Sequence, residues 1–210
     1  MKEIRQALLN AIGYGILEFG FGRKAAGQSF SREIPGGECS LHLGFITHRA
    51  DFDVTADVAV RFHALEALVN KNVRSISDRE QRSTSSLGAE LGNIAGVGQM
   101  RWHVATIDDL DSATTGILNA FKEIGLPYLE VASTMEGAYK LLSAHGRDSW
   151  IHNPIHSARA KRVVGLAKLL EKEDEVPLKI AEYVNLLENN GSLGLADFRD
   201  FLSRLTCTER

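Results

Sequence analysis

The sequence predicts an α+β fold: a small antiparallel sheet of three to five strands, an N-terminal helix packed on one face of it, and a helical C-terminal half. Three patterns predict it: helical spacing of apolar residues near the N-terminus, alternation of apolar and polar residues between 39 and 62, and helical spacing again after 108. We expect an α+β domain over 1–145 with a helical extension packed on it over 146–210, and the alternative is one domain over 1–210.

The first elements are a helix and a short strand. Between 4 and 19, apolar residues recur at intervals of three and four, which gives one buried helix face, and Gly20 and Gly22 follow it. Residues 28–34 then predict a strand that ends at the Pro35-Gly36-Gly37 turn.

Residues 39–47 and 52–62 predict two longer strands that pair as a hairpin about Arg49 and Ala50. In both strands the apolar residues occupy every second position, so each strand has one buried and one polar face. This register keeps both apolar sets on the same side, whereas a slip of one residue would turn one set outward. Since Arg-Ala is a poor two-residue turn, we expect a longer loop.

The rest of the chain is predicted to be mainly helical. A short helix is expected over 63–70 and a strand over 100–106, while the polar, glycine-rich stretch 73–99 is long enough to hold a further strand or helical turn. The next helix, over 108–124, is expected to end at Gly125-Leu126-Pro127. Four further helices are expected over 135–144, 158–171, 178–188 and 195–205.

The composition argues against several classes of protein. With 24 Lys+Arg against 27 Asp+Glu and a net charge of -3, the chain lacks the basic excess of a dedicated nucleic-acid binder. No apolar stretch approaches the roughly 18 residues that cross a bilayer, and the charged, amphipathic start is unlike a signal peptide. Cys39 and Cys207 have neither the spacing nor the setting of a disulfide framework or a zinc site, so we expect a reducing, cytoplasmic compartment.

Familiar cofactor and catalytic motifs are missing from the sequence. The glycine pairs at Gly13 and Gly15 and at Gly96 and Gly98 lack the third glycine and the strand-to-helix setting of a dinucleotide site, and there is no phosphate-binding loop. The motifs G-x-S-x-G of serine hydrolases and H-E-x-x-H of zinc peptidases are absent too. We therefore predict no cofactor and no catalytic residue, and the sequence argues against an enzyme more than for one.

One candidate site lies on the polar face of the hairpin, where His42 is expected opposite Asp57. A carboxylate beside an imidazole is the arrangement that a general base uses, and Ser40 and Thr55 would supply nearby hydroxyls. The alternative is a solvated cross-strand ion pair. We take His42 and Asp57 as candidate binding residues.

A second candidate is a group of histidines. His152 and His156 have the i,i+4 spacing that presents two metal ligands on one helical face, and His145 precedes them. Asn153-Pro154 disfavours a regular helix between the two, and Asp148 is the one carboxylate close by in the sequence. The sequence therefore predicts no metal site, with His152 and His156 as the candidates if one exists.

The third candidate is a basic patch at the start of the helix expected over 158–171. Arg159, Lys161 and Arg162, with Arg147 upstream, could bind an acidic partner or a phosphate near the helix N-terminus, where the helix dipole favours anions. The alternative is a solvated helix face with no partner.

A series of short motifs, in their order along residues 1–145, resembles an uncharacterised bacterial family of small α+β proteins that is known only as a domain of unknown function. The motifs are Glu18-Phe19-Gly20-Phe21, Phe30-Ser31-Arg32, the hairpin over 41–62, Leu87-Gly88-Ala89-Glu90-Leu91-Gly92-Asn93, Arg101-Trp102 and Gly125-Leu126-Pro127-Tyr128-Leu129-Glu130. The resemblance implies a small cytoplasmic α+β protein, and it implies no activity, cofactor or catalytic residue.

Together these patterns favour a non-enzymatic, cytoplasmic binding or interaction protein with a protein partner, and with neither nucleic acid nor membrane as its target. The alternative is a hydrolase-type enzyme that uses the His42 and Asp57 face or a metal held by His152 and His156. A structural or oligomeric subunit is a third hypothesis, and it would need a large apolar self-interface.

Overall fold

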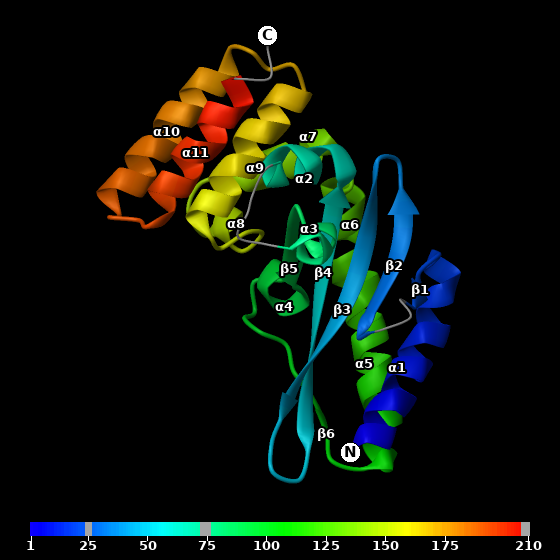
Figure 1. Cartoon of the computed structure of the whole chain (residues 1–210). Helices are drawn as coiled ribbons and strands as arrows, with labels where there is room; N and C mark the ends of the chain where they lie inside the picture. The colour runs from blue at the N-terminus through cyan, green and yellow to red at the C-terminus, as the bar shows by residue number, and fades with distance from the viewer. Residues whose placement is uncertain (24–26, 72–76, 207–210) are drawn as a thin grey trace. The chain divides into compact units, whose positions relative to one another are not determined.

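The computed structural model describes residues 1–23, 27–71 and 77–206 (Figure 1). Its backbone forms two compact units: unit 1 holds residues 1–60 and 88–133, and unit 2 holds residues 61–87 and the chain from Thr134 onward. Strands and helices are combined in the α+β manner that the sequence predicts.

Unit 1 is built on an antiparallel sheet whose described strands run in the order β1-β2-β3-β4-β5, with β6 paired to β4. In β2 and β3 the register places Phe30 opposite Leu41 and Ser29 opposite His42. In β4 and β6 it places Asp53 opposite His103. The strands are β1 (Gly22–Arg23), β2 (Ser29–Ile34), β3 (Gly37–Thr47), β4 (Phe52–Phe62), β5 (Leu87–Glu90) and β6 (Trp102–Val104).

The hairpin of β3 and β4 agrees with the sequence prediction. The backbone N–H of His48 donates to the carbonyl of Asp51 at 3.0 Å, and a Cβ added at Gly44 would lie 2.6 Å from Oγ1 of Thr55, as the predicted register requires. Residues 48–51 lie outside both strands, so the longer loop is confirmed. The buried face carries apolar side chains with 0% exposure: Cys39, Leu41, Leu43, Val54, Ala56 and Val58.

Two helices of unit 1, α1 (Lys2–Ile16) and α5 (Leu110–Ala120), pack against one another beside the sheet (Figure 1). Small residues allow close approach: a Cβ at Gly13 of α1 would lie 3.2 Å from the ring of Phe30 in β2. A Cβ at Gly116 of α5 would lie 2.5 Å from the indole nitrogen of Trp102 in β6. The short 3-10 turn η1 (Leu17–Phe19) follows α1 and completes the helical segment predicted up to residue 19.

The predicted stop after α5 is wrong. The chain continues through a π-helical turn, η3 (Phe121–Gly125), into α6 (Leu126–Ala132), and Pro127 lies in the first turn of α6. A proline inside an α-helix lacks an N–H and clashes with the carbonyl four residues earlier. The wider π turn just before Pro127 relieves that conflict, so the helical path is kept where the sequence indicated an end.

The stretch 73–99 does hold further regular structure, as predicted. It contains α3 (Asp78–Ser83), β5 and α4 (Leu91–Ile94), and the 3-10 turn η2 (Ile107–Asp109) comes after β6. Residues 73–76 lie outside the described part of the chain, as does Cys207.

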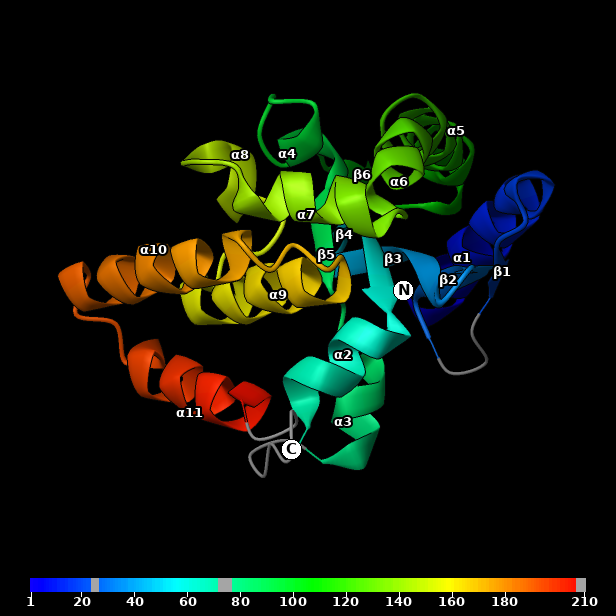
Figure 2. The same cartoon turned by 90° about the horizontal axis from the view of Figure 1, so that it is seen from above.

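Unit 2 is helical and is organised around α9 (His156–Leu169), which packs against α2, α7, α10 and α11 (Figure 2). Every residue from Ala160 to Ala167 is buried. A Cβ at Gly165 would lie 2.8 Å from Leu65, so α2 approaches the backbone of α9 closely. The surrounding helices are α2 (His63–Asn70), α7 (Met135–Ser143), α8 (Arg147–Trp150), α10 (Glu175–Asn189) and α11 (Gly194–Thr206).

The helices predicted from 63–70 and from 135 onward are all present, with small shifts at their ends. Asn189 is the last residue of α10, as the Asn-Asn-Gly signal indicates, and Pro177 lies in its first turn. Within the described ranges, no helix has both the length and the apolar character that crossing a bilayer requires.

Candidate functional site

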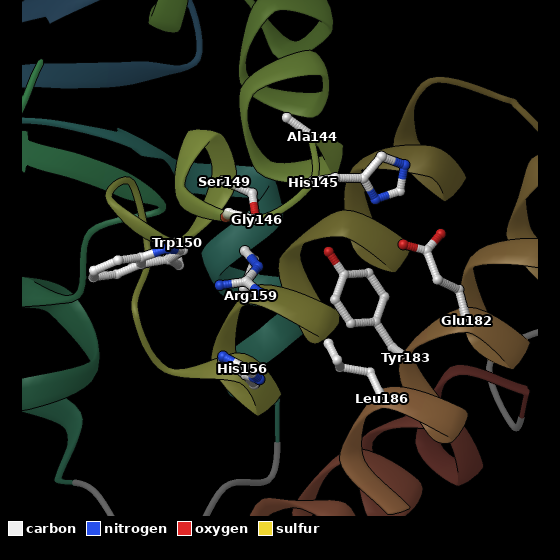
Figure 3. A pocket seen from close by; sticks show the side chains of 10 residues that line it. All are labelled: Ala144, His145, Gly146, Ser149, Trp150, His156, Arg159, Glu182, Tyr183 and Leu186. Carbon is white, nitrogen blue, oxygen red and sulfur yellow. The ribbon is translucent and has the colours of Figure 1, made fainter. Parts of the chain in front are cut away.

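Unit 2 contains a pocket of about 430 Å³, formed by α8, the start of α9 and one side of α10 (Figure 3). Its volume lies within the range of about 300–1,000 Å³ that is typical of small-molecule sites. The residues that line it are Ala144, His145, Gly146, Ser149, Trp150, His156, Arg159, Glu182, Tyr183 and Leu186.

One wall of the pocket is a tight turn between α7 and α8. Gly146 has a φ of 60°, which a glycine adopts without the strain that a side chain would add. Its carbonyl accepts hydrogen bonds from Oγ of Ser149 at 3.1 Å and from the backbone N–H of Trp150 at 3.3 Å. The turn thereby holds Trp150 at the pocket, where 47% of its surface is exposed.

Arg159, in the second turn of α9, is the central charged group of the pocket. It is only 4% exposed, and its Nη1 donates to the backbone carbonyl of Asn153 at 2.9 Å. Its Nε has no hydrogen-bond partner within the described chain. No described carboxylate lies within ion-pair distance of the guanidinium. Burying a cation without an opposite charge beside it is unfavourable.

The opposite wall comes from α10, which contributes Glu182, Tyr183 and Leu186 (Figure 3). Tyr183 is 2% exposed and its hydroxyl donates to the carbonyl of Leu142 at 3.3 Å. Burial raises the pKa of Tyr183, while the neighbouring Arg159 guanidinium acts in the opposite direction. Tyr183 therefore stays protonated at neutral pH.

The start of α9 adds a second feature that favours an anion. No described side chain caps this 14-residue helix, and His156, its first residue, lines the pocket. The N–H groups of the first turn of a helix lack intrahelical partners and carry partial positive charge. The pocket thus joins a buried guanidinium, the N-terminal end of a long helix and an indole ring, which is an arrangement that can hold an anionic group.

The other two residues of the predicted basic patch, Lys161 and Arg162, are also buried, so the alternative of a solvated helix face does not hold for them. Lys161 is 8% exposed, and its Nζ donates to Oδ2 of Asp197 in α11 at 2.7 Å. Arg162 is 7% exposed, and it donates through Nε and Nη2 to the two carboxylate oxygens of Glu66 at 3.0 and 2.9 Å. Both cations bind carboxylates of their own chain.

Glu66 lies at the centre of a buried polar cluster in unit 2 and has no exposed surface. Besides Arg162, it accepts hydrogen bonds from Oγ of Ser86 at 2.9 Å and from Oγ1 of Thr84 at 2.7 Å. Nδ2 of Asn70 adds a longer contact of 3.4 Å. These bonds connect α2, the segment before β5, and α9, so the cluster serves to hold unit 2 together.

The two histidines proposed as metal candidates do not share a helical face. His156 begins α9, whereas His152 lies in the turn before it, as Asn153-Pro154 indicated. His152 is buried, and that burial lowers its pKa to about 4, against the opposing influence of Asp148. The described residues contain no group of three or more His, Cys, Asp or Glu side chains placed to hold a metal ion.

In unit 1 the structure brings His42 and Asp57 to the polar face of the sheet, on neighbouring strands. The hydrogen bond of His42 is made with Ser29 in β2, whose Oγ lies 2.8 Å from Nδ1. Asp57 is half-buried, and burial, together with the nearby Glu90 carboxylate, raises its pKa, while His42 acts in the opposite direction. Ser29, His42 and Asp57 thus form a row across three strands.

A second polar group surrounds Asp53 near the end of the hairpin. Its Oδ1 lies 3.0 Å from Nδ1 of His103, and its Oδ2 lies 3.2 Å from Nε2 of His48. These hydrogen bonds, with His103 contributing most, lower the pKa of Asp53, and Asp53 in turn raises the pKa of His103. His48 and Asp53 belong to the hairpin that the sequence predicts, but His103 arrives through the pairing of β6 with β4, which the sequence analysis did not predict.

Comparisons of the chain with known protein families, with curated proteins and with solved structures find no match. The resemblance to an uncharacterised bacterial family stays a prediction.

Sequence analysis missed the α10 side of the pocket. The sequence pattern around this wall is that of an ordinary amphipathic helix, and nothing in it relates Glu182, Tyr183 and Leu186 to Arg159. The signal that was present is the string of small and apolar residues after Arg162, which indicates a helix buried on all sides and therefore buried neighbours for its charges.

Proposed function

We propose that this chain is a non-enzymatic binding protein whose pocket in unit 2 holds an anionic group of a ligand or protein partner against Arg159. The observation that carries the proposal is the buried guanidinium of Arg159, whose Nε has no partner in the described part of the chain. An anion in the pocket would supply the missing charge and the missing hydrogen-bond acceptor together.

Two further features support the proposal. The uncapped start of α9 favours negative charge in the same pocket, and Trp150 offers an exposed ring against which the rest of a ligand could pack. The volume of about 430 Å³ would enclose a small molecule or the end of a longer chain.

The test compares probes of similar shape but different charge. Acetate, inorganic phosphate and the neutral acetamide would be titrated at constant ionic strength, with Trp150 fluorescence as the readout in a Trp102→Phe background, since the chain has two tryptophans. We expect a saturable change with at least one of the two anions and none with acetamide. If neither anion changes the fluorescence or raises the thermal midpoint, the proposal is wrong.

Two arginine variants make the result specific to the pocket. Arg159→Gln keeps a hydrogen-bonding side chain without the charge, and it should weaken anion binding by about 10- to 100-fold, the usual effect of a charge-assisted hydrogen bond. Arg147→Gln removes the same charge from an exposed residue of α8 that does not line the pocket, so its binding should match the wild type. Equal weakening in both variants would indicate a general charge effect and contradict the proposal.

A second candidate function is a hydrolase-type activity at the Ser29, His42 and Asp57 row of unit 1. The observation that favours it is the 2.8 Å separation between Oγ of Ser29 and Nδ1 of His42, with Asp57 electrostatically coupled to the same imidazole. Hydrolysis of an activated ester would test it. Ser29→Ala should then lower the rate by on the order of 100-fold, and Ser31→Ala, on the next outward position of β2, should leave it unchanged.

A further inference from the structure

His156 lies beside Arg159 on α9. The two residues are three positions apart, so their side chains project from the same face of the helix, with Cβ atoms about 5–6 Å apart. Both line the pocket of unit 2 (Figure 3). Arg159 carries a fixed charge, whereas an imidazole becomes charged as the pH falls through about 6.5. The pocket therefore has one permanent cation and, next to it, a group that becomes a second cation at lower pH.

The ring of His156 is available to a ligand. It is half-buried, and it forms neither a hydrogen bond nor an ion pair with the described part of the chain. His156 is also the first residue of α9, where the backbone N–H groups carry partial positive charge. A proton on His156 would add a second positive charge beside Arg159, so protonation of this ring and binding of an anion favour one another.

Three other titratable groups near the pocket keep one charge state around neutral pH. His152, in the turn before α9, is buried, and that burial lowers its pKa to about 4, so it stays neutral. Tyr183 stays protonated, because burial raises its pKa. Glu182 forms an ion pair with Nζ of Lys179 at 2.7 Å, which matches its charge.

The remaining charged or titratable side chains at this end of unit 2 are exposed. Arg147 and Asp148 belong to α8 and do not line the pocket. His145 does line it, but in the view of Figure 3 its ring lies towards Glu182, whereas His156 lies on the side of Arg159. Because water and salt screen exposed charges, these groups act weakly on an anion at Arg159. His156 is the titratable group placed to act together with Arg159.

Resting on the proposed function, we infer that the pocket takes a doubly charged oxyanion, a phosphoryl or sulfo group, which binds Arg159 and is accompanied by a proton on His156. Two adjacent positive charges match the two negative charges of such a group, whereas a carboxylate carries only one. The N-terminal end of a helix favours the same kind of ligand. The affinity should therefore rise as the pH falls through the titration range of histidine, and a rise in pH should favour release.

Calorimetric titrations of the full chain with sulfate and methyl sulfate, at constant ionic strength, test the inference. Both ions are tetrahedral and keep their charge over the range used, but sulfate carries two charges and methyl sulfate one. We expect sulfate to bind about three- to tenfold more tightly at about pH 6 than at about pH 7.5, with a smaller gain for methyl sulfate. Titrations at about pH 7 in two buffers of different ionisation enthalpy should show uptake of about half a proton per sulfate.

Variants assign the proton to one histidine. His156→Gln keeps a hydrogen-bonding side chain without the charge, so its affinity for sulfate should change less than about twofold over the same range. His156→Lys supplies a permanent charge, so it should bind sulfate at about pH 7.5 at least as tightly as the wild type does at about pH 6. His63→Gln changes an exposed residue of α2 that does not line the pocket, and His145→Gln changes the opposite side of it. Both should keep most of the wild-type pH dependence.

A second measurement needs no substitution. An NMR titration of the His156 ring protons with and without sulfate should show the imidazole charged at a higher pH when sulfate is bound, because the coupling acts in both directions. Comparison of phenyl phosphate with inorganic phosphate at one pH then identifies the source of the anion. Tighter binding of the ester would indicate an organic ligand that packs on the exposed ring of Trp150, and tighter binding of phosphate would indicate the free ion.

The contrary outcomes separate this inference from the proposed function. An affinity for sulfate that does not change with pH, or a pH dependence that persists in His156→Gln, would overturn the inference. Anion binding at Arg159 would still stand if Arg159→Gln abolished it. Equal affinities for sulfate and methyl sulfate at the lower pH would overturn the double charge. If the wild type bound neither of these ions, nor acetate, nor phosphate, the proposed function would fail as well.

Discussion

Arg159 and Arg162 stand three positions apart on α9, and both are almost completely buried, with 4% and 7% of their surfaces exposed. Arg162 donates two hydrogen bonds to the carboxylate of Glu66, which also accepts from Ser86 and Thr84. Arg159 donates to a backbone carbonyl and forms a hydrogen bond with Tyr183, but its Nε has no partner in the part of the chain that the structure describes. Of these two arginines, which lie one helical turn apart, Arg162 is paired with a carboxylate and Arg159 is not.

The difference separates stability from binding. A buried arginine with a carboxylate partner holds the fold together, because removing either partner leaves the other charged and buried. A buried arginine without a carboxylate partner raises the free energy of the unliganded protein. Binding of an anion removes this unfavourable contribution and so favours the bound state. The predictions below use this contrast, from the largest expected effect to the smallest.

Replacing Arg162 should destabilise the protein most. In Arg162→Met the buried carboxylate of Glu66 would lose its two-bond partner and keep the longer ion pair with Arg61, 3.9 Å away, so we expect a loss of about 3 kcal/mol in the free energy of unfolding. Urea denaturation measures it. Glu66→Gln combined with Arg162→Met removes both charges while keeping acceptors for Ser86 and Thr84, so it should recover much of the loss; a double variant no more stable than the single one would contradict the ion-pair explanation.

Acid should also destabilise unit 2, through His152. The folded-state pKa of His152 is lowered from 6.5 to about 4, so the unfolded chain binds a proton that the folded chain excludes. The free energy of unfolding should therefore fall as the pH is lowered from about 6.5 to 4, by up to about 3 kcal/mol. In His152→Asn this slope should be shallower, whereas in the exposed control His145→Asn it should persist; an unchanged slope in His152→Asn would show that another group causes it.

Replacing Arg159 should affect stability far less than replacing Arg162. Arg159→Met loses the hydrogen bonds to the Asn153 carbonyl and to Tyr183, each worth about 1 kcal/mol, but it also removes a buried charge that has no carboxylate partner. We expect the urea-derived stability to change by no more than about 1 kcal/mol in either direction, while the affinity for anions is lost. A destabilisation comparable to that of Arg162→Met would mean that Arg159 is matched within the fold.

The smallest effect is expected at the partly exposed Asp53 group of unit 1. In Asp53→Asn the pKa of His103 should fall towards its ordinary value, because the hydrogen bond that raises it loses its charge. An NMR titration of the histidine ring protons measures this, and Asp51→Asn, which removes a carboxylate 4.0 Å from His103 that is not hydrogen-bonded to it, should lower the pKa of His103 by less. The lowered pKa of Asp53 and the raised pKa of His103 together make the hairpin end most stable between the two values. An unchanged His103 pKa in Asp53→Asn would contradict the assignment.

The sequence was sufficient for the local parts of the fold. Alternation around Leu41 and Val58 fixes which face of each strand is buried, and helical spacing locates α2 and the helices of the C-terminal half. The sequence analysis did not predict the π-helical turn before Pro127, because a proline usually indicates the end of a helix. The wider turn that accommodates this proline has no pattern of residue spacing that would predict it.

The candidate site could be predicted only in part, because its partners lie far apart in the chain. Arg159, Lys161 and Arg162 were selected from the sequence as candidate binding residues, and the sequence did not indicate that all three are buried. Lys161 is matched by Asp197, 36 positions away, and Arg162 by Glu66, 96 positions away. The sequence alone therefore does not show which of the three cations has a carboxylate partner and which, like Arg159, has none among the described residues.

The separation of Glu66 from Arg162 has a consequence for how the protein is made. Because the two residues are 96 positions apart, α2 leaves the ribosome well before its counter-charge in α9 has been synthesised. Until then the Glu66 carboxylate has only the longer ion pair with Arg61, at 3.9 Å, and is more stable hydrated, which disfavours the burial of α2 in any premature contact. At typical synthesis rates of about 5–20 residues per second, this interval lasts roughly 5–20 seconds. The buried ion pair thus delays the completion of unit 2 until α9 is available.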